Sequence, residues 1–193
     1  MKDPARFLIE ARDRIHAFHE GTERWGSRTC RLYTVAVDNT LRELHSRFEG
    51  GEDFCLVATG GYARKVLSPF SDVDVLLISA TSDDPRLEEL GRSVLYPLWD
   101  AGLQVGQRPG TVEEIIASAE DDLAARTALL DLRYVAGSRL IYGALRAAID
   151  EAVLRWKPDL LEAVRHENLA RFAKYGQSVF LLEPHVKEGK GGL

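Results

Sequence analysis

The stretch Gly60-Gly61-Tyr62-Ala63-Arg64, followed by Ser71-Asp72-Val73-Asp74, decides the fold of this 193-residue chain. It lies between two apolar segments. Residues 54–59 form a short, nearly continuous apolar run, which is typical of a buried strand. Residues 73–79 have the same character and predict a second strand with aspartates at its entry. The sequence therefore predicts a strand, a glycine turn and another strand.

The acidic pair and the glycine turn together favour a metal–triphosphate site. Side chains alternate in a strand, so Asp72 and Asp74 project on the same side, where two carboxylates repel unless a cation lies between them. Oxygen ligands without nearby Cys or His favour Mg²⁺ or Mn²⁺ over zinc, which makes Asp72 and Asp74 the candidate catalytic and metal-binding residues. The paired glycines offer backbone N–H groups to phosphate, and Arg64 can hold a phosphate in bidentate fashion. The candidate nucleotide-binding residues are Gly60, Gly61, Arg64, Ser71 and, in the glycine-rich tail, Lys187.

The rest of the chain predicts helices around a small sheet. The expected helices cover residues 4–20, 27–48 and 85–101, and a third strand is expected over 103–108. Thr111 and Glu114 have the spacing of a capping box, and from there the chain is expected to be helical, with breaks near 121, 137 and 158 and a last helix over 159–181. The apolar stripe of the second helix is expected to use Leu32, Val35, Leu41, Leu44 and Phe48.

These elements predict an α+β fold in three parts. An N-terminal helical segment (1–50) precedes the catalytic core (51–110), and a helical lobe follows (111–193). The core is expected to hold a small mixed sheet with flanking helices.

Composition narrows the class of protein. The chain is 45% hydrophobic and 28% charged, as ordinary soluble globular proteins are. Its net charge of -5 and its pI near 5.6 argue against wide nucleic-acid binding. No apolar run reaches the roughly 18 residues of a membrane span, there is no signal-peptide core, and the two cysteines are unpatterned. The expectation is a cytoplasmic protein.

The motif resembles the nucleotidyltransferase superfamily that includes DNA polymerase β, in which a GG or GS turn is followed by DxD. Within it, the chain is similar to the bacterial PII uridylyltransferase/uridylyl-removing enzymes, from about Gly21 to the last residue. The segments that carry this similarity are residues 60–64, 68–77, 96–106, 127–131 and 182–193. Two departures affect the turn: Ala63 and Lys65-Val66 stand where the family usually has Gly and Gly-Glu. Two others affect the third strand: the family often has an acid at position 104 and histidine at 107, where this chain has Gln104 and Gln107.

The resemblance implies a polymerase β-like fold and a Mg²⁺-dependent transfer of UMP from UTP to a tyrosine hydroxyl of the PII nitrogen-signalling protein, with release of pyrophosphate. A third metal carboxylate is left open between Asp121, Asp122 and another acid. The family's removing activity lies in a later hydrolase domain, followed by regulatory domains. The sequence shows no motif of these domains, and we expect it to be a fragment of a longer protein. Two alternatives stay open: a nucleotidyltransferase of the same fold acting on a small molecule, and a non-catalytic nucleotide-binding regulatory module.

Overall fold

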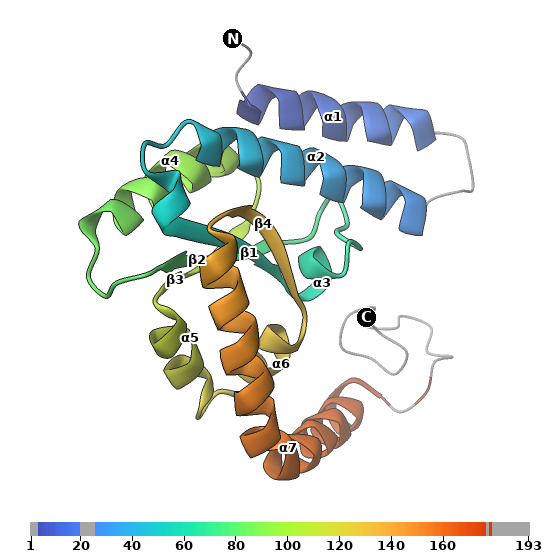
Figure 1. The fold of residues 1–193 in the computed structure, drawn as a ribbon. Coiled ribbons are helices and arrows are strands. Elements are labelled where there is room, and N and C mark those ends of the chain that lie inside the picture. Colours follow the sequence, from blue (N-terminus) through green and yellow to red (C-terminus); the bar gives the residue numbers. More distant parts are fainter. Residues whose placement is uncertain (1–3, 20–25, 177, 179–193) are drawn as a thin grey trace. The chain divides into compact units, whose positions relative to one another are not determined.

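A computed structural model describes residues 4–19, 26–176 and 178 of the chain. The chain divides into two compact units between Ile149 and Asp150, and the first unit holds the sheet. In the described ranges the helices are α1 (Pro4–His19), α2 (Ser27–Ser46), α3 (Gly60–Ala63), α4 (Pro85–Asp100), α5 (Val112–Ala119), α6 (Leu123–Leu130) and α7 (Arg139–Tyr175), with a 3-10 turn over Gly51–Asp53 (Figure 1). The strands are β1 (Phe54–Thr59), β2 (Val73–Ser79), β3 (Val105–Gly110) and β4 (Leu132–Gly137).

The described strands form one mixed sheet in the order β3-β2-β1-β4. β1 pairs with both β2 and β4 in antiparallel fashion, whereas β2 and β3 are parallel and are joined through the crossover helix α4. The α+β class, the small mixed sheet and the first two strands are thereby confirmed. Helix α4 agrees with the expected helix to within one residue.

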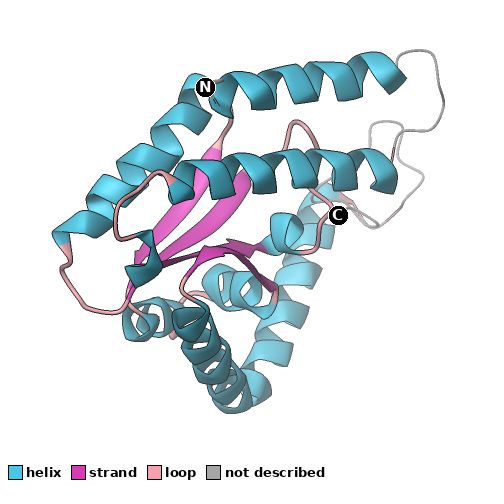
Figure 2. Cartoon of the chain, turned by 45° about the horizontal axis from the view of Figure 1, so that its top comes forward, coloured by secondary structure: helices cyan, strands magenta, loops and turns pink. Residues whose placement is uncertain are grey.

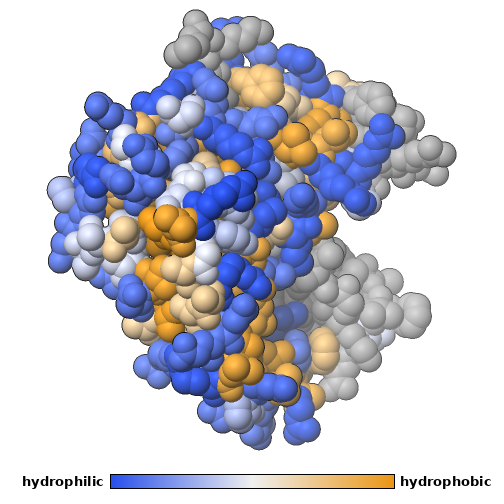
Figure 3. Space-filling view, in the orientation of Figure 1, coloured by the Kyte–Doolittle hydropathy of each residue, from blue (hydrophilic) through white to orange (hydrophobic). Residues whose placement is uncertain are grey.

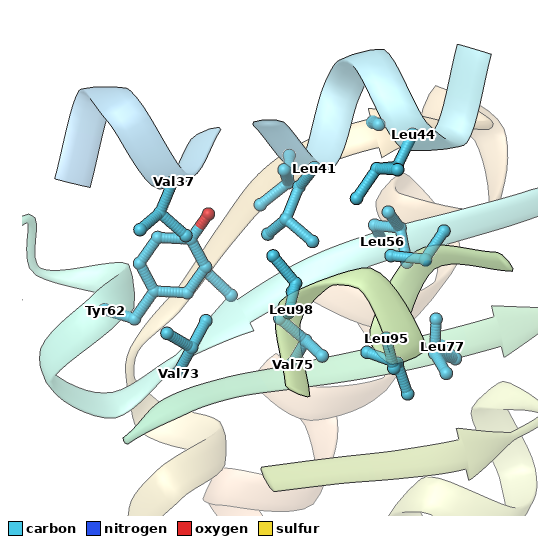
Figure 4. Close-up of a cluster of buried hydrophobic side chains, with 14 of the residues drawn as sticks. Val37, Leu41, Leu44, Leu56, Tyr62, Val73, Val75, Leu77, Leu95 and Leu98 are labelled. Carbon is cyan, nitrogen blue, oxygen red and sulfur yellow. The ribbon is translucent and has the colours of Figure 1, made fainter. Parts of the chain in front are cut away.

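Helices cover both faces of the sheet in the first unit (Figure 2). α2 and α4 lie over one face, where Leu56 and the alternate β2 residues Val73, Val75 and Leu77 point (Figure 4). Those side chains are buried together with leucines of α2 and α4, and the hydrophobic effect of that burial holds the layers together. The intervening residues Asp74 and Leu76 line a cavity on the other face, together with residues of α6.

The expected stripe on α2 is partly wrong. Leu41 and Leu44 are buried, but Leu32 is 45% and Val35 is 54% exposed. The buried face uses Tyr33, Ala36 and Val37 instead. α2 packs on the sheet and also against α1, so its buried face is wider than a single row of leucine and valine.

The expected helical lobe is wrong in two places. Residues 132–137 form strand β4, which pairs with β1 and reaches the edge of the sheet. A single helix, α7, runs through Pro158, where the sequence predicts a break. Proline removes the hydrogen bond to the carbonyl four residues earlier, that of Leu154, and Leu154 is at an exposed position of the helix, with 74% of its surface accessible. The capping box of Thr111 and Glu114 is confirmed, with reciprocal bonds of 2.8 and 3.3 Å.

None of the described helices is long and apolar enough to cross a membrane. The longest, α7, carries charged residues along its whole length. Hydrophilic residues cover much of the face drawn in Figure 3, and hydrophobic residues gather in its middle.

A buried ion pair joins α2, α3 and β4. Both terminal nitrogens of Arg133 donate to the Asp38 carboxylate, at 2.8 and 3.0 Å, and the Tyr62 hydroxyl donates to the same carboxylate at 2.6 Å. Arg133 also donates to the backbone carbonyls of Tyr62 and Ala63, at 3.1 and 3.2 Å. Burial, and after it the Asp38 carboxylate, raises the pKa of Tyr62 well above its ordinary value, so the phenol stays a donor. This network fixes the backbone of α3 to the elements on both sides of it.

Arg133→Met should destabilise the fold by about 2 kcal/mol, because it removes the bidentate partner of the buried Asp38 carboxylate and leaves it only one cation, Arg42, at 3.4 Å. Urea unfolding measures the change. Arg92→Met, which breaks an exposed pair with Glu88, is the control and should cost no more than about 0.5 kcal/mol. Adding Asp38→Asn to Arg133→Met should cost less than the sum of the single losses. A loss at Arg133 as small as that at Arg92 would contradict the role of the network.

Candidate functional site

The register of the sheet brings the glycine turn and the acidic pair together. Asp74 of β2 lies opposite Gly106 of β3. On its other side, the register that pairs Ala58 with Val75 continues to Thr59 and Asp74. Thr59 in turn lies opposite Leu132 of β4. One row across all four described strands therefore places Asp74 beside the end of β1, where Gly60 and Gly61 follow.

Gly106 leaves the space that the Asp74 carboxylate occupies. A Cβ atom at position 106 would overlap with Oδ1 of Asp74, far inside van der Waals contact. The parallel register fixes the two backbones opposite each other, so a side chain at 106 would turn the Asp74 carboxylate away from the place it now occupies. The glycine thus sets the position of one of the two candidate metal ligands.

Asp72 has Gln104 as its neighbour. Val73 lies opposite Val105, and the Val73 N–H donates to the Gln104 carbonyl at 2.9 Å, so the two preceding residues are also adjacent. Gln104 precedes β3 and lines a cavity with Ser71, whereas Asp74 lines a different cavity with Gly106. Asp72, Asp74 and Gln104 are all exposed. A ligand can therefore reach two carboxylates and one amide oxygen from solvent.

The turn after β1 has the backbone that a phosphate loop needs. Gly60 has φ +55, and a Cβ there would meet nothing within 4 Å, so the space above the first turn of α3 is open. At the other end of α3, Lys65 takes the left-handed conformation, with φ 63. Its N–H donates to Tyr62, and the next N–H, of Val66, donates to Gly61, which together form a Schellman motif. Lys65 thus stands in a glycine conformation at the position where the resembling family usually has glycine.

The remaining sequence candidates lie in different surroundings. Arg64 forms an ion pair with Asp131, the residue that links α6 to β4. Ser71 lines a small cavity of about 160 Å³ together with Gln104. Lys187 lies outside the described residues.

Behind Asp74 is a cavity of about 280 Å³ between the sheet and α6. Gly60, Gly106 and Asp74 line one end, and the small side chains of α6 line its wall. Arg108 and Asp122 also line it, and sequence reasoning singled out only Asp122, as a possible third metal carboxylate. Arg108 is two residues beyond Gly106 in β3, so only the strand assignment and its register could have found it.

Asp122 is largely committed to α6. Its Oδ1 accepts the N–H groups of Ala124 and Ala125, at 2.9 and 3.1 Å, which caps the helix. Asp121 does not line the cavity. Among the described residues, no group of three or more His, Cys, Asp or Glu side chains is gathered as a metal site. The acidic pair and the Gln104 oxygen remain as the set that can hold a metal, with the missing ligands supplied by phosphate oxygens and water, as is usual for Mg²⁺.

Residues 37–135 match the family model described as "Nucleotidyltransferase domain". The matched range contains the glycine turn, the acidic pair, the strands β1, β2 and β3, and the first residues of β4. The chain belongs to the nucleotidyltransferase domain family. The polymerase β-like resemblance seen in the sequence is thereby confirmed at the level of the family, and the protein is a transferase.

Two bacterial relatives show what kind of nucleotidyltransferase the chain is similar to. It is 43% identical over 144 residues to a bifunctional uridylyltransferase/uridylyl-removing enzyme of Azospirillum brasilense, an alignment that covers 74% of this chain and 15% of the relative. It is 41% identical over 163 residues to the enzyme of the same name from Bradyrhizobium sp. (strain BTAi1), covering 84% of this chain and 17% of that one. The chain thus spans about one sixth of the length of these relatives.

Among solved structures, the chain is similar to one titled "Crystal structure of the toxin-antitoxin with AMP-PNP". The TM-score is 0.41 and the identity 12%, over 70% of this chain and 98% of that one.

Gly106→Ala should lower nucleotidyl transfer by about 100-fold, because the added methyl group displaces the Asp74 carboxylate by about 1 Å or more. The measurement is pyrophosphate release at saturating nucleotide and Mg²⁺. Gly143→Ala is the matched control, since a Cβ there meets nothing within 4 Å, and it should leave the rate unchanged. Equal rates in the two variants would show that the position of Asp74 does not matter.

Gln104→Glu should tighten Mn²⁺ binding by about tenfold, because it adds a third carboxylate beside Asp72 and Asp74. Electron paramagnetic resonance of free Mn²⁺ measures the change. Gln107→Glu is the control: it lies in β3 on the face opposite to that of Asp74, where its amide oxygen comes within 3.8 Å of a Cβ built at Gly91, and it should have little effect. If both substitutions change the affinity equally, the effect is one of net charge and not of the site.

Proposed function

We propose that this domain transfers UMP from UTP to a tyrosine hydroxyl of a PII-type signalling protein, in a Mg²⁺-dependent reaction that releases pyrophosphate. The observation that carries the proposal is the cavity that Gly60, Asp74 and Gly106 line together, which puts Asp74 beside the glycine turn. The identity of 41 to 43% to uridylyltransferases supports UTP as the nucleotide. The protein acceptor is taken from the family resemblance.

Asp72, Asp74 and Gln104 would hold the metal, and oxygen donors of this kind fit Mg²⁺ or Mn²⁺. Bound there, the ion supplies positive charge to the phosphate oxygens as charge develops on them. The backbone N–H groups of the glycine turn would hold the phosphates beside it. The chain's part in catalysis is thus mainly to position the substrates and stabilise charge.

The transfer itself exchanges one phosphorus–oxygen bond for another. The tyrosine oxygen attacks the α-phosphorus in line and forms the new ester bond. The bond between the α-phosphorus and the bridging oxygen breaks, and pyrophosphate leaves with that electron pair. The phenolic proton is released. The acceptor must approach from solvent, and both carboxylates are exposed at the start of the inner strand β2, open to such an approach.

The decisive experiment measures pyrophosphate release from UTP with Mg²⁺ and a PII protein, with ATP in place of UTP as a parallel reaction. Asp72→Ala and Asp74→Ala should each lower the rate by about 100-fold or more and leave the thermal unfolding temperature close to that of the wild type, because both residues are exposed. Asp100→Ala, at an exposed aspartate that ends α4, is the control and should be fully active. Full activity in either site variant would contradict the mechanism.

The same assay separates the alternatives. A non-catalytic regulatory module would bind Mg–UTP and release no pyrophosphate, and the neutral Gln104 is the feature that favours this reading. A nucleotidyltransferase acting on a small molecule would transfer UMP or AMP to that molecule and leave the PII protein unmodified.

A further inference from the structure

Arg108 lines the cavity that Asp74 lines, and its own carboxylate partner, Asp122, is 4.0 Å away. Arg108 follows Gly106 by two residues in β3, so its side chain leaves the sheet on the same face as Asp74. Gly60 lines the same cavity. Among the described residues that line this cavity, Arg108 is the only lysine or arginine.

The guanidinium of Arg108 is held in place but stays accessible. Its Nη1 donates to the Ser118 hydroxyl of α5 at 3.1 Å, and its Nη2 lies 4.0 Å from Oδ2 of Asp122. The side chain is 40% exposed. An exposed ion pair at 4.0 Å contributes little, so a more highly charged anion can replace Asp122 as the partner of Arg108. The Ser118 contact can persist when this happens, because a guanidinium has five donors.

Two arginines near the glycine turn already have carboxylate partners. Arg64 pairs with Asp131 in direct contact, and Arg133 is buried against Asp38. A nucleoside triphosphate brings about four negative charges, and a guanidinium binds phosphate oxygens in bidentate fashion. The charged side chains that line the cavity are Asp74, Asp122 and Arg108. Because the two aspartates repel a polyphosphate, its binding there depends on a metal ion and on Arg108.

We propose that Arg108 binds the β- and γ-phosphates of the nucleotide, which leave as pyrophosphate, in the cavity between β3 and α6. The inference rests on the proposed function, since it takes a nucleoside triphosphate as the substrate. It assigns to Arg108 a contact with the leaving group, beside the phosphate contacts of the glycine turn and the acidic pair.

The test is calorimetric titration of the full chain with Mg–UTP, Mg–pyrophosphate and UMP. Arg108→Gln should weaken the binding of UTP and of pyrophosphate by about 10- to 100-fold and leave that of UMP unchanged, because UMP lacks the phosphates that Arg108 contacts. Arg108→Lys keeps the charge and should recover part of the loss. Arg92→Gln, at an exposed arginine of α4 paired with Glu88, is the control and should bind all ligands as the wild type does.

A structural role for Arg108 would give a different pattern. If Arg108 only connects β3 to α5 through its hydrogen bond to Ser118, Arg108→Gln should weaken the binding of UMP as much as that of UTP. Ser118→Ala should then have the same effect. Either that pattern or an unchanged affinity for UTP and pyrophosphate would overturn the inference, while turnover of UTP by the wild type would leave the proposed function intact. A wild-type chain that neither binds nor turns over Mg–UTP would overturn the proposed function itself.

Discussion

The buried pair of Asp38 and Arg133 is the interaction on which the site depends. It joins α2 to β4, and through the carbonyls of Tyr62 and Ala63 it also fixes the end of α3. A four-residue helix has no stability of its own, since helices shorter than about 12 residues are marginal in water. Tertiary contacts must therefore hold the turn that begins at Gly60, and a bidentate arginine gives them a defined geometry.

The second constraint is the register of the sheet. Three parts of the site lie up to about fifty residues apart in the sequence: the glycine turn, the acidic pair and the strand β3. Only the pairing of β1, β2 and β3 makes them neighbours. Asp74 needs Gly106 opposite it, and Asp72 has Gln104 beside it. The same pairing carries Arg108 to the far end of the cavity. A site of this kind is fixed by strand pairing more than by any one loop.

Much of the fold was predictable because its signals are local. The apolar runs of β1 and β2, the common face of the two aspartates and the capping box at Thr111 all follow from periodicity and from short-range hydrogen bonds. β4 was missed because one residue, Asp131, separates it from α6, so no turn marks the change. The sequence predicted a break in α7 because proline usually ends a helix. Leu154, four residues before Pro158, is exposed, and this exposure is a tertiary property that the sequence does not show. Arg108 was missed for a related reason: its position on the same face as Asp74 depends on the parallel register of β2 and β3, which the sequence does not display.

The composition of β3 has a consequence for motion. Its six residues, Val-Gly-Gln-Arg-Pro-Gly, include two glycines and a proline, which have low strand propensity, and among the described strands it pairs on one side only. β1, by contrast, is buried along its whole length and has a partner on each side. Local opening costs least where contacts are few, so the edge strand that carries Gly106 and Arg108 opens more readily than β1. The wall of the cavity can then yield to admit a nucleotide while the centre of the sheet stays closed.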